Sequence, residues 1–187
     1  MRPASISDRN LLTALTEVVS RFGVEGASLT RLSEASGLKR ASLYHRFPGG
    51  KDEIVDAVVD HTADRFGKAM KVAYADGDPA ERASELATAI GEYYAQGASS
   101  CLIIALSVSS DEDREGAARC VSGWSDALEN IALDAGLSAS QAHIAAVDAV
   151  AAIEGALVIS ATTGETDSFE RALASLPRRL TSQQAVE

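Results

Sequence analysis

The stretch from Ser28 to Lys51, SLTRLSEASGLKRASLYHRFPGGK, constrains the fold of this chain more than any other. Ser28 is a good N-cap, and Leu29 and Leu32 follow at helical spacing. Gly37 stands where a helix ends in left-handed backbone, which glycine adopts without steric cost. The pattern therefore predicts a short helix that stops at a tight turn.

A second short helix is expected directly after this turn, from about Arg40 to Phe47. Leu43 and Phe47 lie one turn apart and point inward, and the residues Pro48-Gly49-Gly50 stop the helix. Its outward face is small and basic, and consists of Arg40, Ala41, Ser42, His45 and Arg46. Small side chains allow close approach, and arginines can fork onto guanine or phosphate, so this helix is expected to enter the major groove of DNA.

Two segments carry a resemblance to a known family: LSEASGL at 32–38 and LYHRFPGGK at 43–51. Together they resemble the DNA-binding signature of the TetR family of repressors, over roughly residues 11–59. The extra glycine before Lys51 and the segment 97–109 resemble the LmrA/YxaF-like subgroup in particular. The resemblance implies a DNA-binding transcriptional regulator that acts as a homodimer and responds to a small molecule.

The predicted DNA contacts fall into two groups, those that hold the backbone and those that read bases. Hydroxyls at a helix N-terminus bind phosphate well, which assigns Ser28 and Thr30 to the first group. Tyr44, Arg46 and Lys51 are expected to hold phosphates too, Tyr44 and Lys51 on the family's pattern. The residues placed to meet base edges are Lys39, Arg40, Ala41, Ser42 and His45, with Arg40 favoured for guanine. Many family members have Ser or Thr at the position of Lys39, and a lysine cannot cap the helix. The alternative for each charged residue is a solvated surface position.

Charge is distributed unevenly along the 187 residues, whose formal net charge is −10. Residues 1–51 carry eight Lys and Arg against four Asp and Glu, a net charge of +4. The remainder carries nine against 23, a net charge of −14. A basic region on an acidic chain is typical of a protein that touches DNA at one end only.

Abundant alanine, few prolines and short β-branched runs favour an all-α fold of about nine helices. We expect a three-helix helix-turn-helix head, a long connecting helix and a C-terminal helical body for ligand binding and dimerisation. The domains are predicted as residues 1–50 and 51–187. The helices are expected at about 7–22, 28–36, 40–47, 51–74, 79–96, 101–106, 110–135, 138–160 and 168–180, with a kink at Pro177 in the last. The ends, 1–6 and beyond Thr181, are expected to be loose.

The helix predicted at about 138–160 is apolar nearly all round, so both of its sides must be buried. A partner subunit can cover one of them. On the family's pattern, the last two helices of each subunit form the homodimer interface. The alternative is a monomer that buries both helices internally.

The body is the predicted ligand-binding domain. Six residues could line a pocket, although residues of this kind are more often plain core: Phe66, Met70, Tyr93, Tyr94, Trp124 and His143. Asp148 and Glu154 interrupt the most apolar helix, where an unpaired carboxylate is costly. Either could meet a cationic ligand or cap an interface contact.

Other functions receive less support from the sequence. Cys101 and Cys120 are interpreted as reduced, buried thiols, with a thiol-based redox sensor as the alternative. His61 and His143 lack metal-ligand spacing, no phosphate loop or nucleophile motif is present, and neither an enzyme nor a cofactor is expected. No uninterrupted apolar run reaches membrane-spanning length and no signal peptide is recognisable, so we expect a cytoplasmic protein. A DNA-binding dimer without an effector stays open as a third possibility.

Overall fold

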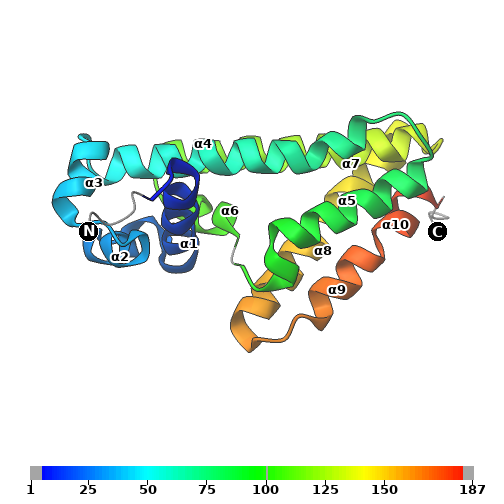
Figure 1. The fold of residues 1–187 in the computed structure, drawn as a ribbon. Coiled ribbons are helices and arrows are strands. Elements are labelled where there is room, and N and C mark those ends of the chain that lie inside the picture. The colour runs from blue at the N-terminus through cyan, green and yellow to red at the C-terminus, as the bar shows by residue number, and fades with distance from the viewer. Residues whose placement is uncertain (1–5, 100, 183–187) are drawn as a thin grey trace. The chain divides into compact units, whose positions relative to one another are not determined.

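The computed structural model describes residues 6–99 and 101–182, and within these residues the chain is helical with no strand. These residues form ten α-helical segments, which confirms the predicted all-α class, and Figure 1 shows them as a ribbon. They are α1 (Asp8–Gly26), α2 (Leu29–Ser36), α3 (Arg40–Arg46), α4 (Lys51–Met70), α5 (Pro79–Tyr93), α6 (Leu102–Ser107), α7 (Asp111–Asp134), α8 (Ala139–Thr163), α9 (Asp167–Ala174) and α10 (Leu176–Thr181). Short 3-10 helices, η1 (Lys71–Tyr74) and η2 (Ala95–Gly97), follow α4 and α5.

The nine predicted helices are all present in the described residues, and the last of them is divided at Ser175 into α9 and α10. Pro177 lies in the first turn of α10, where its missing N–H group is not needed. Side-chain caps explain several helix starts, since Ser7, Ser28, Asp78 and Ser138 each accept a backbone N–H. Most of the two predicted loose ends lies outside the described residues.

The chain forms two compact units. The head unit comprises Met1–Arg65 and Leu102–Ala118, and the body unit comprises Phe66–Cys101 and Arg119–Glu187. Two helices, α4 and α7, contribute residues to both units. The head unit therefore includes α6 and the start of α7 in addition to the helices expected there.

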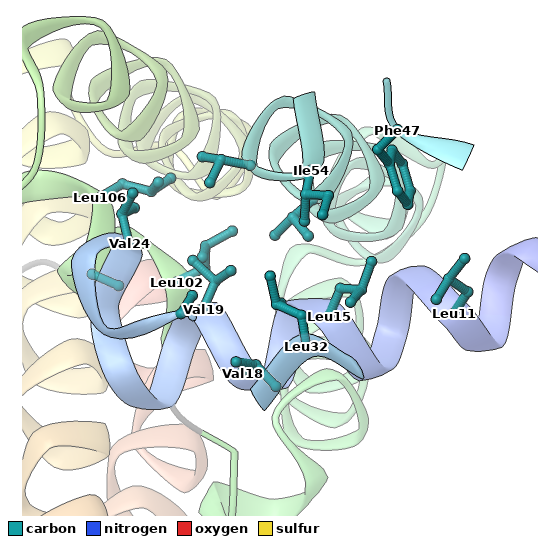
Figure 2. Close-up of a cluster of buried hydrophobic side chains, with 14 of the residues drawn as sticks. Leu11, Leu15, Val18, Val19, Val24, Leu32, Phe47, Ile54, Leu102 and Leu106 are labelled. Atoms are coloured by element: carbon teal, nitrogen blue, oxygen red, sulfur yellow. The ribbon is translucent and has the colours of Figure 1, made fainter. Parts of the chain in front are cut away.

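The head unit has an aliphatic core, which Figure 2 shows in close-up. Leu15 and Val19 of α1, Leu32 of α2, Leu43 of α3 and Val58 of α4 are all fully buried. α6 packs against α1 and completes this core with Leu102, Ala105 and Leu106. Burial of a continuous aliphatic surface gives α2 and α3 a rigid support.

Phe22 departs from the predicted apolar stripe of α1, because it is 42% exposed. Gly23 has a positive φ of 72° and interrupts the helical backbone directly after it. The Phe22 ring instead packs beside guanidinium groups, with the Arg31 Cζ 4.3 Å from its centroid. Arg31 also donates to the Gly26 carbonyl at 2.7 Å, and so ties the end of α1 to α2.

α8 has an apolar face that the described residues leave uncovered. Its large exposed residues are Ile144 and Val147 in the first half of the helix and Val158 and Ile159 in the second half. By length and composition α8 is the one helix of the described chain that could cross a membrane, with a mean hydropathy of 1.9 and 39% of that window buried. Core helices of soluble proteins share these properties, so α8 alone is weak support for a membrane protein.

Candidate nucleic-acid interface and candidate ligand site

The turn between α2 and α3 has the predicted geometry. Ser28 Oγ accepts from the Arg31 backbone N–H at 3.4 Å, and Gly37 adopts left-handed backbone with φ 67° and ψ 6°. Leu43 and Phe47 hold α3 on the core, with exposed fractions of 0% and 8%. This anchoring fixes which side of α3 faces outward.

The outward side of α3 is the basic face that the sequence predicted. All the proposed DNA contacts of α3 are exposed, namely Arg40, Ala41, Ser42, Tyr44, His45 and Arg46. Lys39, which precedes the helix, is exposed as well. Lys39 occupies the N-cap position and its side chain makes no capping hydrogen bond, as expected for lysine. The first turn of α3 therefore keeps backbone N–H groups available at its positive end.

Three basic side chains of this surface already have partners within the head unit. The Arg40 guanidinium donates to Thr30 Oγ1, which joins α3 to the exposed face of α2. Arg46 forms an ion pair with Asp8 at the start of α1. Lys51 Nζ lies 3.7 Å from Glu25 Oε2 and donates to the Glu25 carbonyl at 3.4 Å. These contacts orient the cations, and the two carboxylates compete with phosphate for them.

The turn before Lys51 is held by a residue that sequence reasoning did not single out. Glu53 Oε2 accepts from the Gly49 backbone N–H at 2.6 Å. Gly50 has a φ of 75°, a conformation that favours glycine. Glu53 thus fixes the turn that carries Lys51 into α4, and a glutamate in the first turn of a helix is the signal that could have indicated this role.

The body unit contains a cluster of aromatic side chains, here called the aromatic cluster. Its rings come from α4, α5, α7 and α9, and neighbouring centroids lie 4.8–6.4 Å apart. The members are Phe66, Tyr93, Tyr94, Trp124 and Phe169. Four of them are predicted pocket residues, and the fifth, Phe169, comes from α9 and is buried. Met70 of the same prediction is buried as well.

Polar groups extend from this cluster to α8. The Tyr94 hydroxyl lies 3.4 Å from Cys101 Sγ, and Cys101 donates to Glu154 Oε1 at 3.2 Å. Burial raises the pKa of the Glu154 carboxyl above its usual value, and burial raises that of the Tyr94 phenol well above its usual value. Glu154 therefore resists ionisation unless a positive partner is present.

The structure separates the two carboxylates that the sequence left undecided. Glu154 is half-buried on the side of α8 that carries Val150 and Leu157, whereas Asp148 is exposed. His143 is exposed too, and its Nδ1 lies 3.3 Å from Glu129 Oε2. Asp148 and His143 are therefore not part of the aromatic cluster.

The two cysteines are free thiols in the body unit. Cys101 is buried and bonded as described, and Cys120 is partly buried. Burial raises the pKa of the Cys120 thiol, which lowers its thiolate fraction near neutral pH. This environment favours the structural interpretation over a redox sensor.

Arg82 is a second residue that sequence reasoning missed. It is 5% exposed, and its guanidinium donates to the Ala73 and Ala75 carbonyls at 3.1 and 2.9 Å. It also pairs with Asp134 at 2.7 Å. The signal was its spacing, because position 82 lies one helical turn before the buried Leu86.

Two family models match this chain, one in its N-terminal part and one farther along. Residues 11–58 match the family model described as bacterial regulatory proteins, tetR family. Residues 83–175 match the model of the LmrA/YxaF-like transcriptional regulator C-terminal domain. The chain is 26% identical to the HTH-type transcriptional regulator LmrA of Bacillus subtilis over 166 residues, which are 83% of this chain and 87% of that protein. It is 28% identical to an uncharacterised HTH-type transcriptional regulator of Mycobacterium tuberculosis over 158 residues, 76% of this chain and 78% of that one.

Solved structures show the same fold. A TetR transcriptional regulator from Legionella pneumophila superposes with a TM-score of 0.80 at 16% identity, covering 95% of this chain and 98% of its own. One from Agrobacterium tumefaciens gives a TM-score of 0.75 at 19% identity, over 92% and 96% of the two chains. Such proteins are regulators and not enzymes, as the sequence predicted. The chain belongs to the TetR family of DNA-binding transcriptional regulators, with an LmrA/YxaF-like C-terminal domain.

Proposed function

We propose that this protein is a cytoplasmic repressor that binds a palindromic operator as a homodimer and leaves it when a small molecule binds the body. The observation that carries the proposal is the exposed basic face of α3, anchored by Leu43 and Phe47 on a rigid core. In this proposal residues 1–50 form the DNA-binding domain and residues 51–187 the ligand-binding and dimerisation domain.

Base reading is assigned to the N-terminal part of α3. Arg40 reads guanine, and Thr30 orients its guanidinium through their hydrogen bond. Lys39, Ala41, Ser42 and His45 complete the base-facing set. Phosphate contacts are assigned to Ser28, Tyr44, Arg46 and Lys51 together with Thr30, all of which are exposed or half-buried.

The homodimer is proposed to form through the last two predicted helices, α8 and the pair α9–α10. The uncovered apolar face of α8 supports this arrangement, because four large side chains on it are 44–51% exposed. A second copy of the same helix buries this face symmetrically. Two heads related by a two-fold axis then require a palindromic site.

Ligand response is assigned to the body unit, which contains the aromatic cluster and Glu154. Two helices, α4 and α7, contribute residues to both units and can transmit a change in the body to the head. In the alternative, a dimer without an effector, ligands would leave operator affinity unchanged.

A binding experiment tests the DNA assignments. Duplexes selected from a random library define the operator, and anisotropy titrations at several salt concentrations then compare the wild type with two variants. Arg40→Ala should cost about 1–3 kcal/mol on the operator and little on scrambled DNA. Lys51→Ala should weaken binding to every sequence about equally and reduce the salt slope by roughly 1.

Lys71→Ala, at an exposed lysine in η1 of the body unit, is the matched control and should bind like the wild type. Equal losses for Arg40→Ala and Lys51→Ala on every sequence would contradict the assignment of roles. Selection of no preferred duplex would contradict the proposed function itself.

A further inference from the structure

Four buried side-chain polar atoms of the body unit have no hydrogen-bond partner in the described part of the chain, and two of them, Trp124 Nε1 and Glu154 Oε2, belong to side chains linked to Tyr94. Trp124 is fully buried, so its N–H cannot reach solvent. Buried polar atoms are nearly always paired, and each exception calls for an explanation. A bound ligand with a suitable donor and acceptor would pair both atoms.

Both atoms belong to side chains that surround Tyr94. The Tyr94 and Trp124 rings are stacked with centroids 6.4 Å apart. On its other end, the Tyr94 hydroxyl contacts Cys101, which donates to Glu154 Oε1. One carboxylate oxygen of Glu154 is therefore satisfied from within the protein, and the other is left open.

The surroundings of Tyr94 are aromatic rather than aliphatic. Phe66 meets Trp124 edge to face at 5.1 Å, and Phe169 meets Tyr94 at 6.1 Å. Aromatic faces attract cations, most strongly where water is excluded. The rings that are linked to Glu154 through Tyr94 and Cys101 thus favour a positive charge.

The body unit has an open groove of about 420 Å³ lined by residues of α5, η2, α9 and α10. Leu173 and Gln96 line it, and each lies close in the chain to a cluster member, Leu173 to Phe169 and Gln96 to Tyr94. Between Tyr94 and the groove the backbone is strained, because Ala95 and Gln96 have positive φ values of 48° and 56°. Consecutive non-glycine residues in this conformation are unusual and mark a segment whose geometry is imposed by its surroundings.

We propose that Glu154 and Trp124 bind a cation that carries an alkylammonium group, an aromatic ring and an oxygen acceptor. Its ammonium N–H donates to Glu154 Oε2, its oxygen accepts from Trp124 Nε1, and its ring packs against the aromatic cluster. The inference deepens the proposed function, because it names the chemical class of the effector.

A cation fits better than a neutral ligand for an electrostatic reason. A neutral hydroxyl can donate to Glu154 but leaves a buried charge uncompensated, or requires the carboxyl to stay protonated. A cation compensates the charge and interacts with the surrounding rings. An anion is excluded, because it would face the carboxylate directly.

The occupied site has a covalent route to the head unit. Cys101, which donates to Glu154, is the last residue of its segment in the body unit. The next residue, Leu102, begins α6, and α6 packs against α1. A ligand that draws Glu154 away from Cys101 therefore acts on the residue that precedes α6.

Trp124 is the only tryptophan of the chain, so its fluorescence reports on the site. The probes are procaine and propranolol, which carry an aromatic ring, oxygen acceptors and an alkylamine that is protonated at pH 7, and benzocaine, which is an ester of the same aminobenzoic acid as procaine but lacks the alkylamine and is uncharged. Both amines should change the emission saturably, and benzocaine should bind at least about tenfold more weakly. Benzocaine binding as tightly as procaine would overturn the choice of a cation.

Variants test whether Glu154 and Trp124 contact the ligand or only support the fold. Glu154→Gln should weaken procaine about 10- to 100-fold and leave benzocaine unchanged, because it removes only the charge. Asp148→Asn, on the exposed side of the same helix, should leave all three probes unchanged. Trp124→Phe removes the fluorescent residue, so thermal shift is used to measure its binding. The variant should bind procaine more weakly than the wild type and should remain folded.

Two results would overturn the inference: neither amine binds saturably, or Glu154→Gln binds both amines like the wild type. Either would indicate that ordered water alone satisfies the two atoms. Operator titrations on the same samples test the proposed function separately from the ligand class. If the protein binds an operator but neither amine, the proposed regulator stands and the ligand class is wrong. If it binds the amines but no operator, only the proposed function is contradicted.

Discussion

The two units of this protein place their polar groups in opposite ways. The head unit has an aliphatic core, and its functional cations lie on the surface with intramolecular partners. The body unit has aromatic rings in its interior, and polar atoms lie among them. Of the five buried side-chain atoms without a partner in the described residues, four belong to the body unit and only Thr62 Oγ1 to the head unit.

This difference indicates what each interior is suited to. An aliphatic interior satisfies itself by close packing and needs no further partner, so it can hold a recognition helix in one geometry. An interior with open donors and acceptors is stabilised by whatever supplies the missing groups. Binding energy is therefore available in the body unit, where a ligand can change the stability of one arrangement relative to another.

The largest expected effect tests whether buried polar groups stabilise the body unit. Arg82→Met removes the ion pair with Asp134 and leaves the Ala75 carbonyl without its side-chain donor, whereas the Ala73 carbonyl keeps its hydrogen bond from Asn130 Nδ2. We expect a loss of about 3 kcal/mol in unfolding free energy, measured by urea denaturation. Arg114→Met is the matched change in the head unit, at an exposed pair with Asp111, and should cost less than about 1 kcal/mol. Equal losses would contradict the contrast between the units.

The next effect concerns Glu154 and pH. Because burial raises its pKa, the folded chain holds this proton to higher pH than the unfolded chain, whose carboxyl titrates near 4.5. Wild-type stability therefore falls as pH rises through 4.5 to the folded-state pKa, and the penalty is complete above it.

Glu154→Gln removes this penalty while keeping an acceptor for Cys101. Thermal denaturation should show the variant more stable by about 1 kcal/mol at pH 7.5, with the gain vanishing below the unfolded-state pKa. Glu85→Gln, the same substitution at an exposed glutamate of α5, is the control and should match the wild type in stability at pH 7.5. A variant that is less stable than the wild type at every pH would mean that Glu154 serves the fold rather than a ligand.

Sequence reasoning succeeded where the determinants are local. The start of α2 at Ser28, the left-handed Gly37 and the inward Leu43 lie within one short segment, and their spacing is enough to define the turn. The capping box of Ser138 and Gln141 at the start of α8 was predicted for the same reason.

It did not reach contacts between distant residues. Packing of Leu102 and Leu106 into the head unit, pairing of Cys101 with Glu154 and the role of Arg82 all join segments that no short window contains. The choice between Asp148 and Glu154 depended on which side of α8 is covered, and an almost uniformly apolar helix carries no pattern that identifies that side.

Backbone strain gives a smaller contrast between the units. Gly37→Ala places a Cβ on a residue with φ 67°, where space is open but the conformation is unfavourable, and should cost about 1 kcal/mol. Gln96→Gly relieves the same kind of strain in the body unit and should gain a few tenths to about 1 kcal/mol. Urea denaturation measures both, and a loss of stability in Gln96→Gly would show that its side chain contributes more than the strain costs.

The smallest effect concerns Glu25, whose carboxylate lies 3.7 Å from Lys51 Nζ and is 95% exposed. Exposed pairs of this kind contribute little to stability, so Glu25→Gln should fold like the wild type. It frees Lys51 for phosphate and removes a negative charge beside the DNA, which should raise operator affinity about two- to threefold at low salt, with the gain shrinking as salt screens the charge. Glu85→Gln, on α5 of the body unit, makes the same charge change and serves as the control in the anisotropy titrations. If Glu25→Gln weakens operator binding instead, the Glu25–Lys51 contact orients the lysine more than it competes with phosphate. DNA binding by the head unit would then depend on its surface ion pairs as much as on its core.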